Sequence, residues 1–140
     1  MLFDFIKDEK SPLKNFEGLI TNLTDIENFA KTSPLEAVLR ARIALERFVN
    51  AILEINKVEI PDDLEERKKL KLEHTANKLK FLFEKGIIDK KLLTYLNTVR
   101  RAGNEVANQN IGNIKDFNAK KVIEYLYEAI NLYVEKNKEI

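Results

Sequence analysis

The stretch "SPLEAVLRARIALERFVNAIL", residues 33–53, decides the fold. Its apolar residues recur at steps of three and four, which is the period of an α-helix with one buried face. Ser33 stands where an N-cap is expected, Pro34 suits the first helical position, and Glu36 stands where a capping box places its carboxylate. Apolar side chains cover more than half of the helix circumference. The stretch therefore predicts a long, central helix that ends near residue 56.

Four further segments show the same helical spacing. They are expected at about residues 13–31, from the charged stretch "LEERKKLKLEH" (64–74) to Gly86, from Asp89 through Val106, and from about Asp116 to Lys136. Ahead of them, the apolar extension 1–12 fits either a short helix that caps the bundle or a dimer contact. Because no segment alternates like a strand, we predict a single all-α domain over residues 1–140, an up-and-down bundle of four to five helices.

Composition excludes several classes of site. The chain has no Cys and one His among 140 residues, which leaves no thiolate ligand and no imidazole cluster for a metal, so we predict no metal and no cofactor. The formal net charge of +1 gives no overall field that would attract nucleic acid. We find neither a signal peptide nor an apolar run of the roughly 18 residues that span a bilayer. We therefore expect a cytoplasmic protein.

The segment "NTVRRAGNEVANQNIG", residues 97–112, holds an unusual polar stripe. Glycine within a helix costs roughly 1 kcal/mol relative to alanine, so Gly103 predicts that another group approaches the backbone closely. Polar residues recur beside the apolar seam at steps of three and four, which places them along one side of the helix. The members of this Arg/Asn stripe are Asn97, Arg100, Arg101, Asn104 and Asn108.

A second unusual residue is Arg42, which falls on the inner seam of the central helix. A guanidinium there needs a partner, because an unpaired buried charge is costly. Glu46 follows four residues later and is correctly placed for an ion pair along the helix. We expect this pair to face the Arg/Asn stripe and to support it.

These motifs resemble a known superfamily. The Arg–Glu step of residues 42 and 46, and the Arg–Gly–Asn step of residues 100, 103 and 104 within "LFEKGIIDKKLLTYLNTVRRAGNEVAN", are similar to those of a helical domain of unknown function in the HEPN superfamily. The similarity covers most of the chain from about residue 16 to 134. The opening "FDFIKDEKSPL" is similar to the start of such domains in type I restriction motor subunits. The resemblance implies a HEPN-like homodimer that works in antiphage defence, restriction-modification or a mobile element.

In catalytic members of that superfamily, the resemblance implies a metal-independent endoribonuclease in which an Arg stabilises phosphate and a His moves protons. Arg100 or Arg101 matches the arginine here, whereas Asn108 stands in place of the His, and an amide cannot act as a general base. We therefore expect a non-catalytic module that binds RNA or a partner protein through the Arg/Asn stripe. The alternative is an endoribonuclease whose candidate catalytic residues are Arg100, Arg101, Asn104 and Asn108.

A structural role competes with each functional interpretation. The Arg/Asn stripe could be a polar network between helices, and the Arg42–Glu46 pair could serve packing alone. His74 could reach the stripe, although a single His at a helix edge is more often an exposed or hydrogen-bonded structural residue. The basic run "RKKLK", residues 67–71, could touch nucleic acid, but its acidic neighbours favour a solvated face. The tyrosines of the last helix are expected to pack the bundle.

Overall fold

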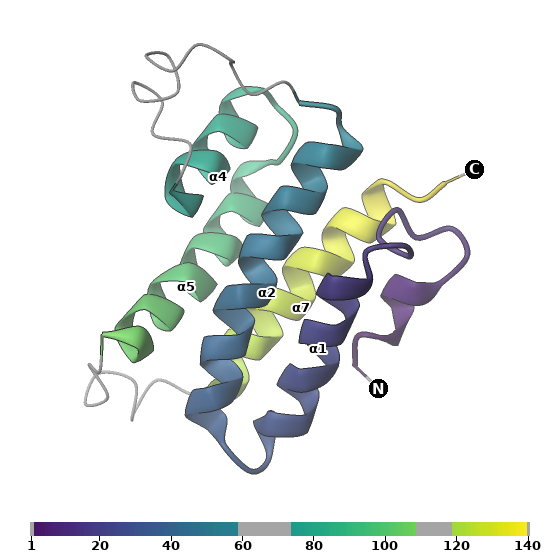
Figure 1. Ribbon diagram of the computed structural model, residues 1–140. Coiled ribbons are helices and arrows are strands. Elements are labelled where there is room, and N and C mark those ends of the chain that lie inside the picture. Colours follow the sequence, from purple (N-terminus) through teal and green to yellow (C-terminus); the bar gives the residue numbers. More distant parts are fainter. Residues whose placement is uncertain (1, 59–73, 109–118, 140) are drawn as a thin grey trace.

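The computed structural model describes residues 2–58, 74–108 and 119–139, and the regular structure in these ranges is entirely helical. The elements are a 3-10 helix, η1 (Asp4–Lys7), and the α-helices α1 (Glu17–Ala30), α2 (Pro34–Ile55), α4 (Thr75–Glu84), α5 (Lys90–Ala107) and α7 (Ala119–Lys136). Five packed α-helices in the described ranges confirm the all-α prediction (Figure 1). The basic run 67–71 and the predicted helix start at Asp116 lie outside the described residues.

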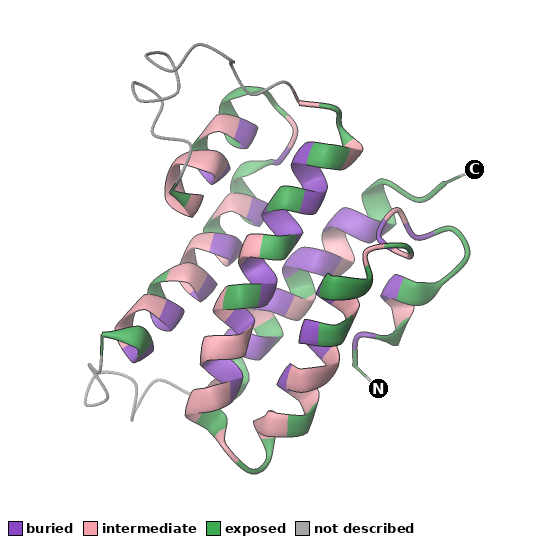
Figure 2. Ribbon diagram, viewed as in Figure 1, coloured by how far each residue is buried: buried purple, intermediate pink, exposed green. Residues whose placement is uncertain are grey.

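Helix α2 is the centre of the bundle, as its apolar circumference predicts. It packs against α1, α4, α5 and α7, with α1 and α7 on one side and α4 and α5 on the other (Figure 1). Val38, Leu45 and Phe48 have no exposed surface, and burial of such a side chain stabilises the fold by roughly 1.5–3 kcal/mol. Buried residues of α2 alternate with intermediate and exposed ones around the helix (Figure 2). Ile43 is one of its exposed residues, with 40% of its surface accessible.

Helix α1 begins later than the apolar spacing predicts, at Glu17 instead of residue 13. The preceding residues form turns in which the Ser11 hydroxyl accepts a hydrogen bond from the Leu13 N–H at 3.1 Å. Pro12 restricts the backbone at this point. Leu13 is nevertheless fully buried, so it belongs to the core without belonging to the helix.

The N-terminal extension folds back onto the bundle through η1. The Phe3 N–H donates to the Glu27 carboxylate at 2.8 Å, and Phe3 and Ile6 are buried. The rings of Phe3 and Phe5 pack against the Tyr127 ring in edge-to-face geometry, with centroid separations of 6.0 and 5.5 Å. Within this chain the extension therefore forms the short capping helix.

The other tyrosines of α7 also pack inside the bundle. Tyr125 stacks on Tyr95 with the ring centroids 5.4 Å apart, and Tyr133 meets Phe48 edge-on at 5.5 Å. The Tyr133 hydroxyl accepts a hydrogen bond from the Asn56 amide at 3.2 Å. Burial raises the pKa of Tyr133, and the hydrogen bond from Asn56 acts in the opposite direction. These rings are used for packing, as the sequence predicts.

The boundary between α4 and α5 follows from local capping. Gly86 has φ of +74°, the left-handed conformation that glycine adopts without strain. The Ile87 N–H donates to the Leu82 carbonyl and the Gly86 N–H to the Phe83 carbonyl, both at 3.0 Å, which is a Schellman motif. The predicted end of this helix at Gly86 is confirmed, and the chain turns there so that α4 lies against α5.

The N-termini of α2 and α5 differ in their capping. The Asp89 carboxylate accepts from the Leu92 N–H at 2.8 Å, whereas the Ser33 side chain makes no capping hydrogen bond. The predicted capping box of α2 does not form, because the Glu36 carboxylate instead accepts from Arg40 Nε at 3.0 Å.

Asp89→Ala is therefore expected to lower the free energy of unfolding by about 1 kcal/mol, since it removes a capping hydrogen bond. Ser33→Ala is the matched control and should change this free energy by less than about half as much. Urea denaturation followed by circular dichroism measures both. An equal loss in the two variants would contradict the assignment of the cap.

Candidate functional site

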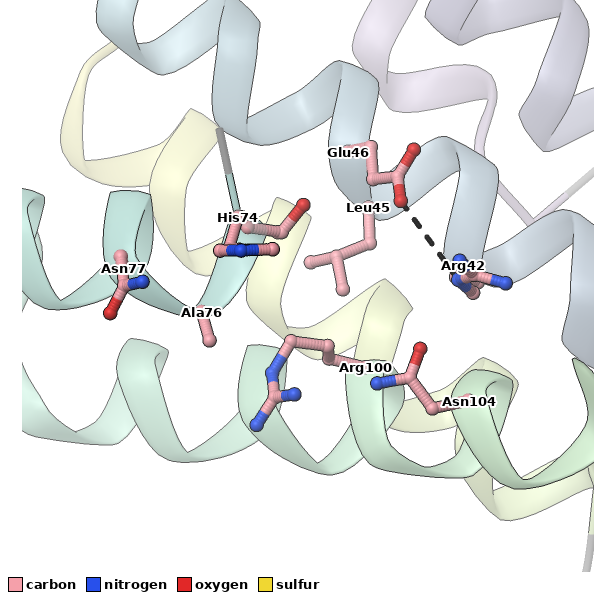
Figure 3. Close-up of a pocket in the computed structure, with 9 residues that line it drawn as sticks. Arg42, Leu45, Glu46, His74, Ala76, Asn77, Arg100 and Asn104 are labelled. Carbon is pink, nitrogen blue, oxygen red and sulfur yellow. Dashed lines mark ion pairs between the residues drawn. The ribbon is translucent and has the colours of Figure 1, made fainter. Parts of the chain in front are cut away.

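A cavity of about 450 Å³ opens between α2, α4 and α5. Its polar lining comes from all three helices, with Leu45 projecting between the polar groups (Figure 3). The lining residues are Arg42, Leu45, Glu46, His74, Thr75, Ala76, Asn77, Arg100 and Asn104. This volume lies within the range of roughly 300–1,000 Å³ that is typical of small-molecule sites.

Helix α2 contributes an ion pair to the cavity. Arg42 Nε lies 3.9 Å from the Glu46 carboxylate, one helical turn away, and the two side chains are 38% and 46% exposed. A half-exposed pair at this distance is weak, with a typical stabilisation of roughly 0–1 kcal/mol. An anion of higher charge could therefore replace Glu46 as the partner of the Arg42 guanidinium.

Helix α5 contributes Arg100 and Asn104. Arg100 Nε donates to the Asn97 side-chain oxygen at 3.2 Å, which orients the guanidinium along α5, and the Asn104 amide points towards the stem of Arg100 (Figure 3). Burial lowers the pKa of Arg100, and repulsion from Arg101 lowers it further. The guanidinium stays protonated at neutral pH. Both causes make this cation unfavourable where it stands, so an anion beside it would be stabilising.

Gly103 explains how α2 and α5 approach each other at this cavity. A Cβ atom on Gly103 would lie 2.5 Å from Arg42 Cβ and 3.0 Å from Arg42 Cγ. The first of these atoms is fixed by the α2 backbone, so it cannot move aside without moving the helix. The glycine therefore lets the Arg42 stem lie directly against α5, and Arg42 joins Arg100 around one cavity.

Helix α4 contributes its N-terminus. His74 is the N-cap residue, and the first intrahelical hydrogen bonds are donated to its carbonyl by Asn77 and Lys78, at 3.0 and 3.1 Å. The N–H groups of Thr75 and Ala76 precede those bonds, in the part of a helix where the partial positive charge of the helix dipole concentrates. Because these first-turn residues line the cavity, the positive end of α4 faces Arg42 and Arg100.

The structure divides the predicted Arg/Asn stripe. Arg100 and Asn104 line the cavity, and Asn97 supports Arg100 through its hydrogen bond. Arg101 and Asn108 are exposed and lie outside the cavity lining, and Asn108 caps the C-terminus of α5. Each residue along a helix turns by about 100°, so Arg101 projects away from the α2 side on which Arg100 and Asn104 stand.

Thr75 and Asn77 are not among the predicted site residues, and His74 is predicted only as a residue that could reach the stripe. All three line the cavity because α4 packs against α5 beside Arg100. A helical repeat fixes which residues share a face but not which neighbouring helix arrives there. The one relevant signal in the sequence is Gly86, because a glycine at the end of a helix favours a tight turn of the chain.

Comparisons of the chain with known protein families, with curated proteins and with solved structures found no match. Among the residues that the structure describes, no group of three or more Asp, Glu or His side chains could hold a metal ion. In the same ranges, no helix has both the length and the hydropathy required to cross a bilayer. The function is therefore inferred from the geometry of the cavity. Guanidinium groups, amides and a helix N-terminus around a cavity are suited to binding an oxyanion.

Proposed function

We propose that the chain is a non-catalytic, HEPN-like helical module that binds the phosphate groups of single-stranded RNA in the cavity between α2, α4 and α5. The observation that supports this proposal is the convergence of Arg42, Arg100 and the first turn of α4 on one 450 Å³ space. RNA is favoured over a protein partner because a lining of guanidinium and amide donors matches phosphate oxygens. A place in a defence or mobile-element system is part of the proposal and rests on the motif resemblance.

Several donor types support phosphate over a simple carboxylate. Arginine forks fit the spacing of phosphate oxygens, asparagine amides add donors, and helix N-termini recur at phosphate sites. Arg42, Arg100 and Asn104 supply side-chain donors from α2 and α5, and the first turn of α4 supplies backbone N–H groups. Donors from three helices therefore line one space.

A second candidate function is metal-independent RNA cleavage, and the position of His74 favours it. An imidazole can donate or accept a proton near neutral pH, which the Asn108 amide cannot do. His74 lines the same cavity as Arg100, so a proton-transfer group and a phosphate-binding cation face one space. The same RNA-binding samples, kept in EDTA and run on a denaturing gel, would detect cleavage. RNA cleavage by the wild-type protein that is lost in His74→Asn would establish this second function and show that the module is catalytic.

The homodimer that the resemblance implies belongs to this proposal as well. Ile43 is a large apolar side chain on α2 that is 40% exposed. A second copy of the chain could cover it. Sedimentation of wild type beside Ile43→Glu would detect such a contact as a change from dimer to monomer.

Glu46→Gln tests the proposed binding directly and should raise the affinity for RNA. The substitution removes the negative charge from the cavity and frees Arg42, and a unit charge at about 4 Å in high dielectric contributes ~1 kcal/mol, roughly fivefold in affinity. Fluorescence anisotropy with a labelled oligouridine in EDTA measures the dissociation constant.

Glu84→Gln is the matched control, because Glu84 also pairs along its helix, with Lys80 at 4.0 Å, but does not line the cavity. It makes the same change in net charge and should alter affinity by less than about twofold, since exposed charges are screened. Equal gains in the two variants would mean that overall charge, and not the cavity, attracts RNA. Absence of binding by the wild-type protein would refute the function.

A further inference from the structure

We propose that the cavity recognises a terminal phosphate, the phosphate monoester at the end of an RNA strand, in preference to the diesters within the strand. This inference rests on the proposed function, because it specifies which phosphate the cavity between α2, α4 and α5 accepts. Three observations support it: the number of donors, the balance of charge and the size of the site.

The cavity offers more donors than an internal phosphate can use. A diester has two free oxygens, whereas a monoester has three. Arg42 approaches from α2 and Arg100 from α5, and each guanidinium can donate two parallel hydrogen bonds. The Asn104 amide adds a further side-chain donor, and the first turn of α4 adds backbone N–H groups. The lining therefore holds enough donors for the three terminal oxygens of a monoester.

The charge of the lining also matches a dianion. Arg42 and Arg100 are cationic, Glu46 is anionic, and the N-terminus of α4 adds a partial charge of about +0.5. For the lining residues that the structure describes, the excess of about one and a half positive charges compares with a monoester charge of roughly −1.5 to −2 near neutral pH, against −1 for a diester. A monoester therefore neutralises the cavity, whereas a diester leaves it positively charged. Desolvation of Arg100 and the nearby charge of Arg101 increase that difference, because both destabilise an unpaired Arg100 cation.

The size of the site favours a strand end. Helices α2, α4 and α5 border the cavity, and its volume of about 450 Å³ is that of a site for one small group. A diester carries a nucleoside on both sides, so both flanking residues would need a path out of the same space. A terminal phosphate needs only one path.

The test compares three unlabelled oligouridines of one length as competitors of a labelled strand: one with hydroxyl ends, one with a 5′-phosphate and one with a 3′-phosphate. We expect one phosphorylated strand to bind about tenfold more tightly than the hydroxyl-ended strand, which is the strength of one additional charge-assisted contact. The two phosphorylated strands show which end is recognised. In Arg100→Gln this advantage should fall to less than about twofold, since the partner of the extra charge is lost.

Asn104→Asp provides a second variant of nearly unchanged shape. The new carboxylate repels a dianion more than a monoanion, so it should weaken binding of the phosphorylated strand more than binding of the hydroxyl-ended strand. Equal affinities for all three strands, with binding still dependent on Arg100, would refute end recognition and leave the phosphate-binding function standing. If no strand binds the wild-type protein, the proposed function fails together with this inference.

Discussion

Gly103→Ala is expected to reduce the free energy of unfolding by about 2 kcal/mol, the cost of overpacking a contact that cannot relax, less the gain from better helix propensity. The new methyl carbon would lie 2.5 Å from Arg42 Cβ, so α5 must move away from α2. For a domain of this size the loss corresponds to a fall in melting temperature of roughly 6 °C. Differential scanning calorimetry measures it.

The contact with Arg42 Cβ can be tested by a double-mutant cycle. In an Arg42→Ala background the β-carbon remains, so Gly103→Ala should still destabilise the protein. In an Arg42→Gly background the β-carbon is gone, and Gly103→Ala should become stabilising by up to about 1 kcal/mol, the ordinary helix preference for alanine. A stabilising effect in the wild-type background would contradict the close contact between α2 and α5.

Arg100→Gln is expected to weaken RNA binding by about tenfold to thirtyfold, because it removes a partly desolvated cation that donates charge-assisted hydrogen bonds worth roughly 1.5–2 kcal/mol. Glutamine keeps amide donors and a similar chain, so the change isolates the charge. The slope of log affinity against log salt concentration should also fall by about one, the contribution of one phosphate contact. Anisotropy titrations of a labelled oligouridine over a series of salt concentrations measure both effects.

Arg101→Gln is the control that the structure offers for this result. Arg101 is the next residue of α5, with the same charge, but it is exposed and outside the cavity lining. We expect its affinity to change by less than about twofold, since exposed charges are well screened. Equal effects of the two substitutions would show that α5 binds RNA through a diffuse basic surface instead of the cavity.

The fold was predictable from the sequence because its determinants are local. The apolar period of residues 33–53 predicts the central helix, and the Gly86 and Asp89 signals place the boundary between α4 and α5 correctly. The prediction was wrong where a second local interaction replaced the expected one. Glu36 pairs with Arg40 instead of closing a capping box, and the turn at Ser11 and Pro12 delays the start of α1.

The candidate site was only partly predictable, for a different physical reason. Arg100, Asn104 and the Arg42–Glu46 pair could be found because helical spacing fixes which residues share a face. The same spacing could not show which of Arg100 and Arg101 faces the cavity, since that depends on where α2 and α4 pack against α5. His74 stands at the start of α4, and its place in the cavity follows from contacts between helices that no local pattern encodes.

The most direct test of the central claim is a titration of ¹⁵N-labelled protein with 5′-phosphorylated oligouridine, followed by two-dimensional ¹H–¹⁵N NMR. If phosphate binds in the cavity, the largest shifts should occur at the backbone amides of Thr75 and Ala76 and at the side chains of Arg100 and Asn104, because these groups line it. Unchanged signals from those groups, with the largest shifts on a surface away from the cavity, would contradict the account.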